Sequence, residues 1–270
     1  MKLLELRNEL KKEFSQQDID VADVDFIASE ILGVRRTELA LIDEIDELKV
    51  QEIKTKAKAR LNNVPVEKIF NKAYFYGLEF WVDENVLSPR PETEMVVEEA
   101  LKFITENNYV QVLDLCTGSG CIAISIKKNS EATVTASDIS TKALQIAKNN
   151  AKRHDVEINF IKSNMFENLE GKFDLIVSNP PYIDTQEIEL LDKEVKEHDP
   201  FIALDGGELG LKYYNIIHDN LRKVLNDNGM LILEIGDEQK DLIVSLFNDF
   251  DLVKSLKDYS GNDRVLIFKK

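Results

Sequence analysis

An asparagine, two prolines and a tyrosine, Asn179-Pro180-Pro181-Tyr182, follow an apolar stretch of the sequence. The preceding residues, 173–178 (FDLIVS), are apolar and partly β-branched, and they predict a buried strand. Two prolines fix φ twice and remove two backbone donors, and each restricts the residue before it to extended geometry. We therefore expect a stiff loop that offers carbonyl oxygens and almost no backbone N–H groups.

Such a loop suits a ligand that carries a planar NH2 group. The Asn179 side-chain oxygen and the Pro180 carbonyl can accept both hydrogens of that group. Its nitrogen is a poor nucleophile because the lone pair is delocalised, so fixed acceptors that orient it and stabilise the developing charge favour attack. Tyr182 can lie flat against the group and exclude water. No carboxylate catalyst is needed if the electrophile is a sulfonium methyl group.

A second candidate site lies in a glycine-containing turn, LDLCTGSG (residues 113–120), between a predicted strand and a predicted helix. Gly118 and Gly120 allow positive φ and close approach of a ligand to the backbone. Asp138 ends the next predicted strand, where a carboxylate can accept hydrogen bonds from both hydroxyls of a ribose. The glycines and the spaced aspartate together indicate an adenosine-containing cofactor.

The identity of this cofactor depends on Asp114, which lies four residues before Gly118. Residues 118–123 also satisfy the dinucleotide pattern G-x-G-x-x-G/A, so NAD is a competing candidate. A carboxylate at this strand end would repel a pyrophosphate but attract an ammonium group. The asparagine–proline loop also offers nothing to a hydride transfer. A cofactor that carries an amino acid, such as S-adenosylmethionine, fits better.

Composition limits the class of protein and its partners. The chain has 270 residues, of which 43% are hydrophobic and 31% charged, with a net charge of −16. This charge opposes nonspecific binding to nucleic acid and favours a basic protein partner. There is no apolar run of about 20 residues that would cross a membrane, and the N-terminus does not resemble a signal peptide. Two cysteines and three scattered histidines show no metal spacing, so we expect a cytoplasmic protein without a metal site.

The hydrophobic pattern predicts three regions. Residues 1–72 repeat apolar positions at helical spacing and predict a small helical bundle. Residues 73–90 are aromatic and β-branched and predict a hairpin or extended linker. In residues 91–270 strands and helices alternate, which predicts a doubly wound α/β domain with a mostly parallel, seven-stranded sheet. The last two strands are too close together for a crossover helix, so the last strand is expected to be antiparallel.

The connection over residues 184–211 is long for a segment between a strand and a helix. Residues 185–198 (TQEIELLDKEVKEH) predict a helix within it. We interpret the connection either as a lid or substrate shelf, or as a flexible solvated segment.

Over nearly its whole length the sequence resembles the S-adenosylmethionine-dependent methyltransferases, and more narrowly the peptide-chain release factor glutamine N5-methyltransferases. The motif NPPY is shared with methylases of amino groups on nucleic-acid bases. The proline-rich block PRPETE (residues 89–94) and the domain order narrow the resemblance to glutamine. The other blocks that carry it, in chain order, are LDLCTGSG, ASDIS, SNPPYID, HDPFIALDGGELGL, LEIGDEQ and DYSGNDRV.

This resemblance implies methyl transfer from S-adenosyl-L-methionine to the side-chain amide nitrogen (N5) of the glutamine in the Gly-Gly-Gln loop of class I peptide chain release factors. It also implies that the helical domain, residues 1–72, helps to recognise this protein substrate, with no membrane and no direct nucleic-acid binding. The implied catalytic residues are Asn179, Pro180 and Tyr182. The implied cofactor-binding residues are Asp114, Thr117, Gly118, Ser119, Gly120, Asp138, Ile139, Asn164, Met165 and Asn179. The implied substrate-binding residues are Asn179, Pro180, Pro181, Tyr182, Arg90 and Glu94.

Two departures from the family pattern affect the cofactor site. Cys116 replaces the first glycine of the loop, and Asn164 stands where an aspartate is common, although it can still accept a bond from an adenine amino group. Three alternatives remain at this point: a glutamine of a ribosomal protein as substrate, an amino group on a nucleic-acid base as substrate, and a cofactor-binding adaptor without turnover.

Overall fold

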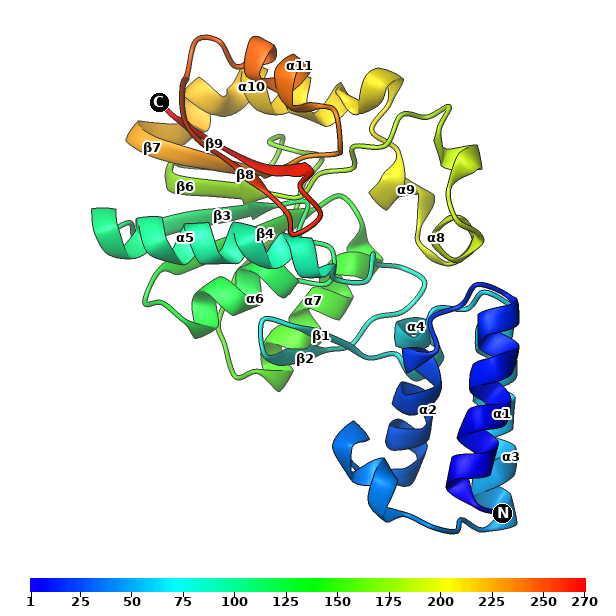
Figure 1. Cartoon of the computed structure of the whole chain (residues 1–270). Helices are drawn as coiled ribbons and strands as arrows, with labels where there is room; N and C mark the ends of the chain where they lie inside the picture. The colour runs from blue at the N-terminus through cyan, green and yellow to red at the C-terminus, as the bar shows by residue number, and fades with distance from the viewer. The chain divides into compact units, whose positions relative to one another are not determined.

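The computed structural model describes residues 1–270, which divide into two compact units, Met1–Asn71 and Lys72–Lys270. The first unit is helical, as Figure 1 shows. Its helices bury a common apolar core, to which the spacing of Leu3, Leu6, Leu10 and Phe14 on the first helix contributes one face. The elements of this unit are α1 (Leu3–Gln16), α2 (Ala22–Leu32), the 3-10 helix η1 (Arg36–Leu41), α3 (Glu47–Leu61) and α4 (Val66–Phe70).

The second unit begins with a hairpin of β1 (Ala73–Phe75) and β2 (Leu78–Phe80). Its two turn residues, Tyr76 and Gly77, have φ values of 50° and 73°, the conformation favoured in two-residue hairpin turns. Phe75 and Phe80 are buried in the core of the second unit, so the hairpin packs as part of it. The chain then runs to the short 3-10 helix η2 (Pro91–Thr93) and to α5 (Glu94–Asn107).

A seven-stranded sheet forms the centre of this unit, in the order β5-β4-β3-β6-β7-β9-β8. The strand β9 runs antiparallel to both of its neighbours, whereas the other pairs are parallel. The predicted mostly parallel sheet with an antiparallel last strand is therefore confirmed. The strands are β3 (Gln111–Leu115), β4 (Thr133–Asp138), β5 (Asn159–Lys162), β6 (Phe173–Ser178), β7 (Leu225–Glu234), β8 (Asp251–Lys257) and β9 (Asp263–Lys269).

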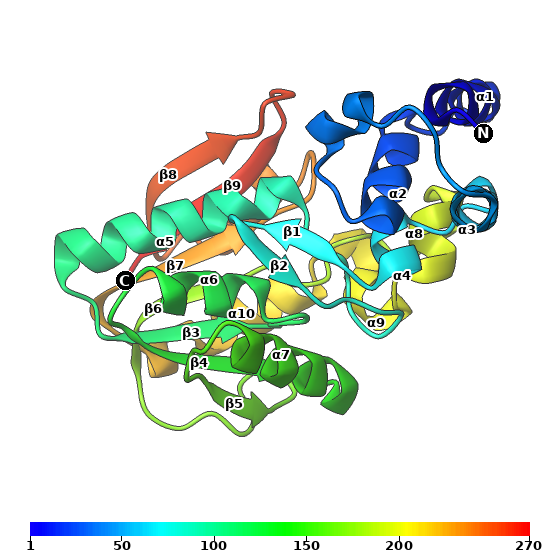
Figure 2. The same ribbon diagram turned by 90° about the horizontal axis from the view of Figure 1, so that it is seen from below.

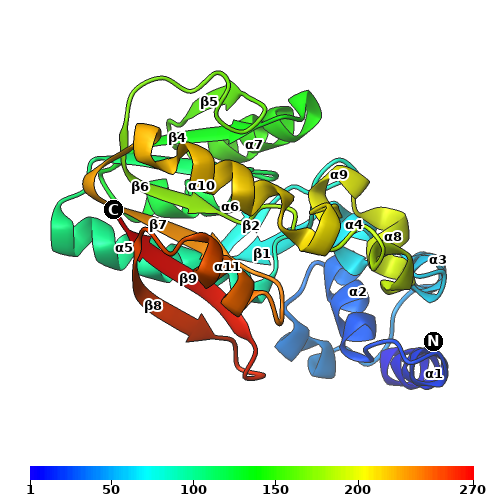
Figure 3. The same cartoon turned by 90° about the horizontal axis from the view of Figure 1, so that it is seen from above.

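Helices cover both faces of the sheet. One face packs against α5, α6 (Cys121–Lys128) and α7 (Thr141–Arg153), which lie toward the viewer in Figure 2. The other face packs against α10 (Lys212–Val224) and α11 (Lys240–Leu246), which lie toward the viewer in Figure 3. Because β3 and β6 are central and parallel, their carboxyl ends meet at one edge, where α/β sheets of this kind bind ligands. None of the helices combines the length and apolar character needed to span a bilayer.

The helix predicted over residues 185–198 forms only in part. The chain makes one 3-10 turn, η3 (Ile188–Leu190), and then α8 (Lys193–His198), because Leu191 and Asp192 between them have extended ψ values of 154° and 140°. The rest of the connection forms α9 (Phe201–Leu204) and η4 (Glu208–Gly210). Ile183 bridges to Asp205, so the connection returns to its own starting point.

Candidate active site

The turn after β3 is built over a buried carboxylate, that of Asp114. This side chain is fully buried, and its Oδ2 accepts hydrogen bonds from Thr117 Oγ1 at 2.6 Å and from the Ala123 amide at 3.1 Å. Burial raises the pKa of Asp114 to about 7, although these two hydrogen bonds oppose the rise. Its Oδ1 has no hydrogen-bond partner in the protein. Asp114 therefore shapes the turn from beneath, with one oxygen unpaired within the protein.

The two glycines of the turn have different roles. Gly118 has a φ of +55°, no atom lies within 4 Å of the place where a Cβ would be, and its amide donates to Asp138 Oδ2 at 2.9 Å. Gly120 has a φ of +83°, and a Cβ there would lie 3.0 Å from the Ala147 Cβ. Gly118 thus leaves open space, while Gly120 allows the start of α6 to pack closely on α7.

Cys116 adopts the left-handed conformation, with a φ of 65°. A glycine takes this conformation freely, whereas another residue loses about 1 kcal/mol or more. The thiol lies 3.8 Å from the sulfur of Met165, and burial raises its pKa well above the ordinary range. A glycine, which the family resemblance implies at this position, would adopt this backbone without strain.

The remaining cofactor-site candidates follow β4 and β5. Both oxygens of Asp138 accept backbone hydrogen bonds, from Gly118 and, at 2.8 Å, from Ser140. Burial raises the pKa of Asp138. The side chain of Asn164 is exposed, while Met165 is 6% exposed and has a φ of 50°. Asp138, Asn164 and Met165 line the same cleft as the glycine turn, so all of them lie at one edge of the sheet.

The cleft has a volume of about 970 Å³, including space open to solvent. Ten of the predicted site residues contribute to its wall: Arg90, Thr117, Gly118, Ser119, Asp138, Ile139, Asn164, Met165, Asn179 and Pro181. Five others do not line it: Glu94, Asp114, Gly120, Pro180 and Tyr182. Three residues of the long connection, Pro200, Ile202 and Ala203, also line it, so the start of α9 borders the cleft.

Asn179 stands at the end of β6, next to the glycine turn. Ser178 pairs with Leu115 of β3, and its hydroxyl donates to the Leu115 carbonyl at 2.7 Å. The Asn179 Nδ2 donates to Thr93 Oγ1 at 3.3 Å. Its NH2 group is thereby engaged by the protein, and its amide oxygen is the part suited to a ligand donor.

Tyr182 is enclosed by glycines from two distant sequence blocks. A Cβ at Gly206 would lie 2.7 Å from the Tyr182 Cα, one at Gly210 would lie 1.9 Å from its carbonyl oxygen, and one at Gly236 would lie 3.1 Å from its ring. The Gln239 Nε2 donates to the Tyr182 carbonyl at 2.8 Å. Only glycine allows this approach, so the blocks DGGELG and LEIGDEQ fix the position of the tyrosine.

The two charged residues of the proline-rich block separate in the structure. The Arg90 Nη2 lies 3.2 Å from Asp199 Oδ2, which ties the block to the long connection at the cleft wall. The Glu94 Oε1 accepts a 2.7 Å hydrogen bond from the Tyr76 amide in the hairpin turn. Glu94 therefore holds the β1–β2 hairpin.

Three buried polar residues were not singled out by the sequence. Thr93 is 2% exposed and lines the cleft, and Glu234, at the end of β7, is 2% exposed with one oxygen, Oε2, lacking a partner. Asn150 on α7 is fully buried and bonds to the Trp81 amide at 2.8 Å, the Trp81 carbonyl at 3.0 Å and the Ser119 carbonyl at 2.9 Å. Thr93 and Glu234 lie within recognised sequence blocks, but for Asn150 the sequence carries no signal beyond a polar residue on an apolar helix face.

Solved structures of the same fold are methyltransferases. A methyltransferase from Pyrococcus furiosus matches with a TM-score of 0.56 at 21% identity, over 79% of this chain and 98% of that one. A Thermus thermophilus 16S rRNA N2 G1207 methyltransferase in complex with AdoMet and guanosine matches with a TM-score of 0.51 at 18% identity, over 74% of this chain and 49% of that one. The sheet order and these matches define the class I methyltransferase fold.

Sequence relatives narrow the class. Residues 93–211 match the family described as "Methyltransferase small domain". A release factor glutamine methyltransferase from Thermodesulfovibrio yellowstonii is 36% identical over 100% of this chain and 99% of its own length, and one from Agrobacterium fabrum is 36% identical over 93% and 90%. The chain belongs to the release factor glutamine methyltransferase family, and it is a methyltransferase.

Proposed function

We propose that this enzyme transfers a methyl group from S-adenosylmethionine to the side-chain amide nitrogen of the glutamine in the Gly-Gly-Gln loop of class I release factors. The observation that carries the proposal is the orientation of Asn179 in the cleft wall. Its NH2 group is held by Thr93, so its oxygen is the group that suits the N–H of an amide. The names of the sequence relatives support glutamine and a release factor as the substrate.

The cleft fits the cofactor because it contains buried polar atoms without partners. The hydroxyls of Ser119 and Ser137 line it and make no hydrogen bond within the protein, and Asp114 Oδ1 beneath the turn makes none either. Buried polar atoms of this kind normally have partners. The ammonium, carboxylate and ribose hydroxyls of S-adenosylmethionine supply such partners, and its sulfonium supplies the reactive methyl group.

The remaining cofactor contacts follow from the wall of the cleft. Each Asp138 oxygen accepts one backbone hydrogen bond and retains a lone pair for a ribose hydroxyl. We assign Asn164 and Met165, after β5, to the sides of the adenine. The open space at Gly118 leaves room for the methionine part against the backbone.

The loop after β6 orients the target nitrogen. In this proposal the Asn179 oxygen and the Pro180 carbonyl accept the two amide hydrogens, which fixes the nitrogen for in-line attack. Tyr182 shields the amide from water. The extra proton leaves after the transfer, so no buried base has to remove it beforehand.

We further propose that the first unit helps to recognise the release factor and that the enzyme acts in the cytoplasm. The net charge of −16 supports a partner with a basic surface, because opposite charges steer encounter. A release factor domain that docks on ribosomal RNA has that character.

The proposal is tested by incubating the enzyme with methyl-labelled S-adenosylmethionine and a class I release factor that has either Gln or Ala in its Gly-Gly-Gln loop. We expect label only on the Gln form, and mass spectrometry should place one methyl group on that glutamine. Equal labelling of both forms would contradict the proposal. Parallel incubations with ribosomal protein and with ribosomal RNA identify the alternative substrates, since label would then appear there.

A further inference from the structure

A chain of three polar side chains leads from the cleft into the core of the second unit. Asn179 donates to Thr93 Oγ1 at 3.3 Å, and both side chains lie close enough to the buried carboxyl group of Glu234 to favour its ionised form. The strands bring these residues together, because Ser178 of β6 pairs with Leu233 of β7, and Asn179 and Glu234 are the residues that follow. Thr93 reaches them from η2, in the proline-rich block.

The direction of each hydrogen bond in this chain is set by the carboxylate. An ionised carboxylate only accepts, so it favours a Thr93 hydroxyl that points its proton toward Glu234 and a lone pair toward Asn179. The NH2 group of Asn179 satisfies that lone pair. A flipped amide would instead place its oxygen against two acceptors and present a donor where the target N–H must bind.

We propose that Thr93 and Glu234 are positioning residues that lock the Asn179 amide with its oxygen available to the target nitrogen. This inference rests on the proposed function, because the lock matters only for a substrate that donates an N–H. It also assigns a role to the threonine of PRPETE and to the glutamate of LEIGDEQ, to which the proposed cofactor contacts assign none.

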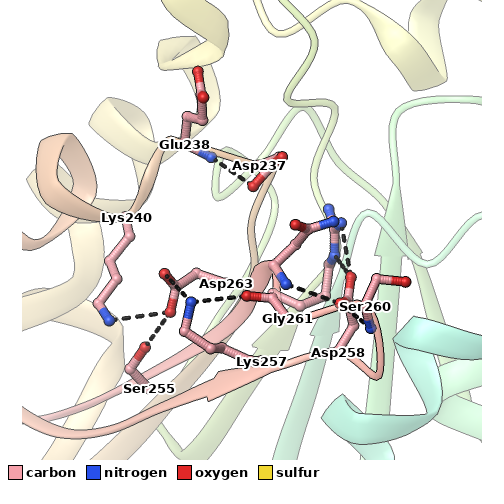
Figure 4. A network of polar contacts seen from close by, with 11 residues as sticks. Asp237, Glu238, Lys240, Ser255, Lys257, Asp258, Ser260, Gly261 and Asp263 are labelled. Atoms are coloured by element: carbon pink, nitrogen blue, oxygen red, sulfur yellow. Dashed lines mark hydrogen bonds and ion pairs between the residues drawn. The ribbon is translucent and has the colours of Figure 1, made fainter.

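A fixed cation stabilises the ionised form of Glu234. Arg264 of β9 acts on it electrostatically, and the Arg264 Nη1 also donates to the carbonyl of Ile235, the next residue, at 3.3 Å. The arginine is held by Asp258, which accepts from Arg264 Nη2 at 3.0 Å. Asp258 itself is fixed in the β8–β9 turn by the Ser260 amide, as Figure 4 shows.

The other titratable groups that face Glu234 are Glu92 of η2, Tyr182, Tyr214 of α10 and Cys121 of α6. Burial raises the pKa of Glu234 to about 7, while the bonds from Thr93 and Asn179 and the charge of Arg264 oppose the rise. Above that pH the carboxylate can only accept, and the Thr93 hydroxyl and the Asn179 amide are held in the orientation described above. Below it, the carboxylic acid can donate to Thr93, whose hydroxyl is then free to reverse.

The lock is tested with the full chain by measuring kcat for release factor methylation at saturating cofactor. Thr93→Val keeps the shape of the side chain and removes the hydroxyl, and it should lower kcat roughly tenfold to a hundredfold. Thr93→Ser should stay within about twofold of the original enzyme, since the hydroxyl between Asn179 and Glu234 is retained. Thr105→Val, the same exchange at an exposed position of α5, is the matched control and should have no effect.

Glu234→Gln provides a second readout that packing alone would not change. Its amide can donate as well as accept, so kcat should fall by a similar factor. The rise in kcat through about pH 7 that we expect of the unaltered enzyme should also be lost. The Kd for S-adenosylmethionine should remain within about twofold in all variants, because none of these changes alters a group assigned to the cofactor.

An unaltered kcat in Thr93→Val, or a Glu234→Gln variant that keeps the rise through pH 7, would overturn the lock while leaving glutamine methylation intact. Failure of the unaltered enzyme to label the glutamine would instead overturn the proposed function, and the lock with it. If Thr93→Val does not fold, Thr93→Ser and the pH profile of Glu234→Gln decide.

Discussion

The loops after β3 and after β6 end at the same edge of the sheet, but different parts of the chain hold them. Within the β3 turn, Asp114 accepts from Thr117 and Ala123, and Gly120 donates to the Thr117 carbonyl at 2.8 Å. The β6 loop depends on distant residues: Thr93, the glycines around Tyr182, and Gln239. The proposed cofactor side is therefore held within the consecutive segment from β3 to α7, which includes Asp138 and Asn150, whereas the proposed target side is assembled from the whole sheet domain.

Replacing Asn179 by alanine should show the largest difference between an effect on turnover and an effect on cofactor binding. Removing the amide deletes one of two acceptors for the target nitrogen, so kcat should fall by a factor of about 10² to 10³. The Kd for S-adenosylmethionine should change less than about twofold, as measured by calorimetry. Asn149→Ala, on the exposed surface of α7, is the control. A matching loss of cofactor affinity would assign Asn179 to the cofactor instead.

The buried carboxylate of the β3 turn should make stability depend on pH. The folded-state pKa of Asp114 is about 7 against an ordinary 3.8, so the folded protein binds the additional proton between these values and loses stability as pH rises through them. From pH 5 to pH 8 this loss should amount to roughly 3 kcal/mol. In Asp114→Asn the free energy of unfolding, measured in urea, should no longer fall by this amount between pH 5 and pH 8. If the variant keeps the pH dependence of the original protein, Asp114 is not the buried titrating group.

Gly210→Ala tests the packing around the β6 loop. A Cβ at this position would overlap the Tyr182 carbonyl, and φ is +67°. Gly171→Ala, at an exposed turn with a φ of +85° and open space, has the same backbone cost without the overlap. We expect Gly210→Ala to lower the unfolding free energy about 2 kcal/mol more than Gly171→Ala does, and to reduce turnover more than cofactor binding. Equal effects of the two variants would argue against this packing.

Ser137→Ala should have the smallest effect. Its hydroxyl lines the cleft without a partner in the protein, so its removal should change stability by less than about 0.5 kcal/mol. If it binds the cofactor, affinity should fall about fivefold, the value of one hydrogen bond. Ser125→Ala removes another buried hydroxyl without a partner, on α6 and outside the cleft wall, and should leave affinity unchanged.

The same contrast explains what the sequence could predict. The parallel sheet, its antiparallel end and the strand–turn–helix around Gly118 depend on local periodicity and short spacings, and these predictions agree with the structure. The partners of Asn179 could not be predicted, because the pairing of β6 with β7 is set by strand order. Likewise, nothing near Tyr182 in the sequence indicates that Gly210 and Gly236 pack against it.

The two cysteines in the cleft wall bear on the durability of the enzyme. A thiolate is a much stronger nucleophile than an amide nitrogen, so an ionised cysteine beside an activated methyl group would be alkylated in preference to the substrate. Burial raises the pKa of Cys121 to about 12 and that of Cys116 higher still. Both are therefore held as neutral thiols at physiological pH, the form that competes least with the substrate for an activated methyl group.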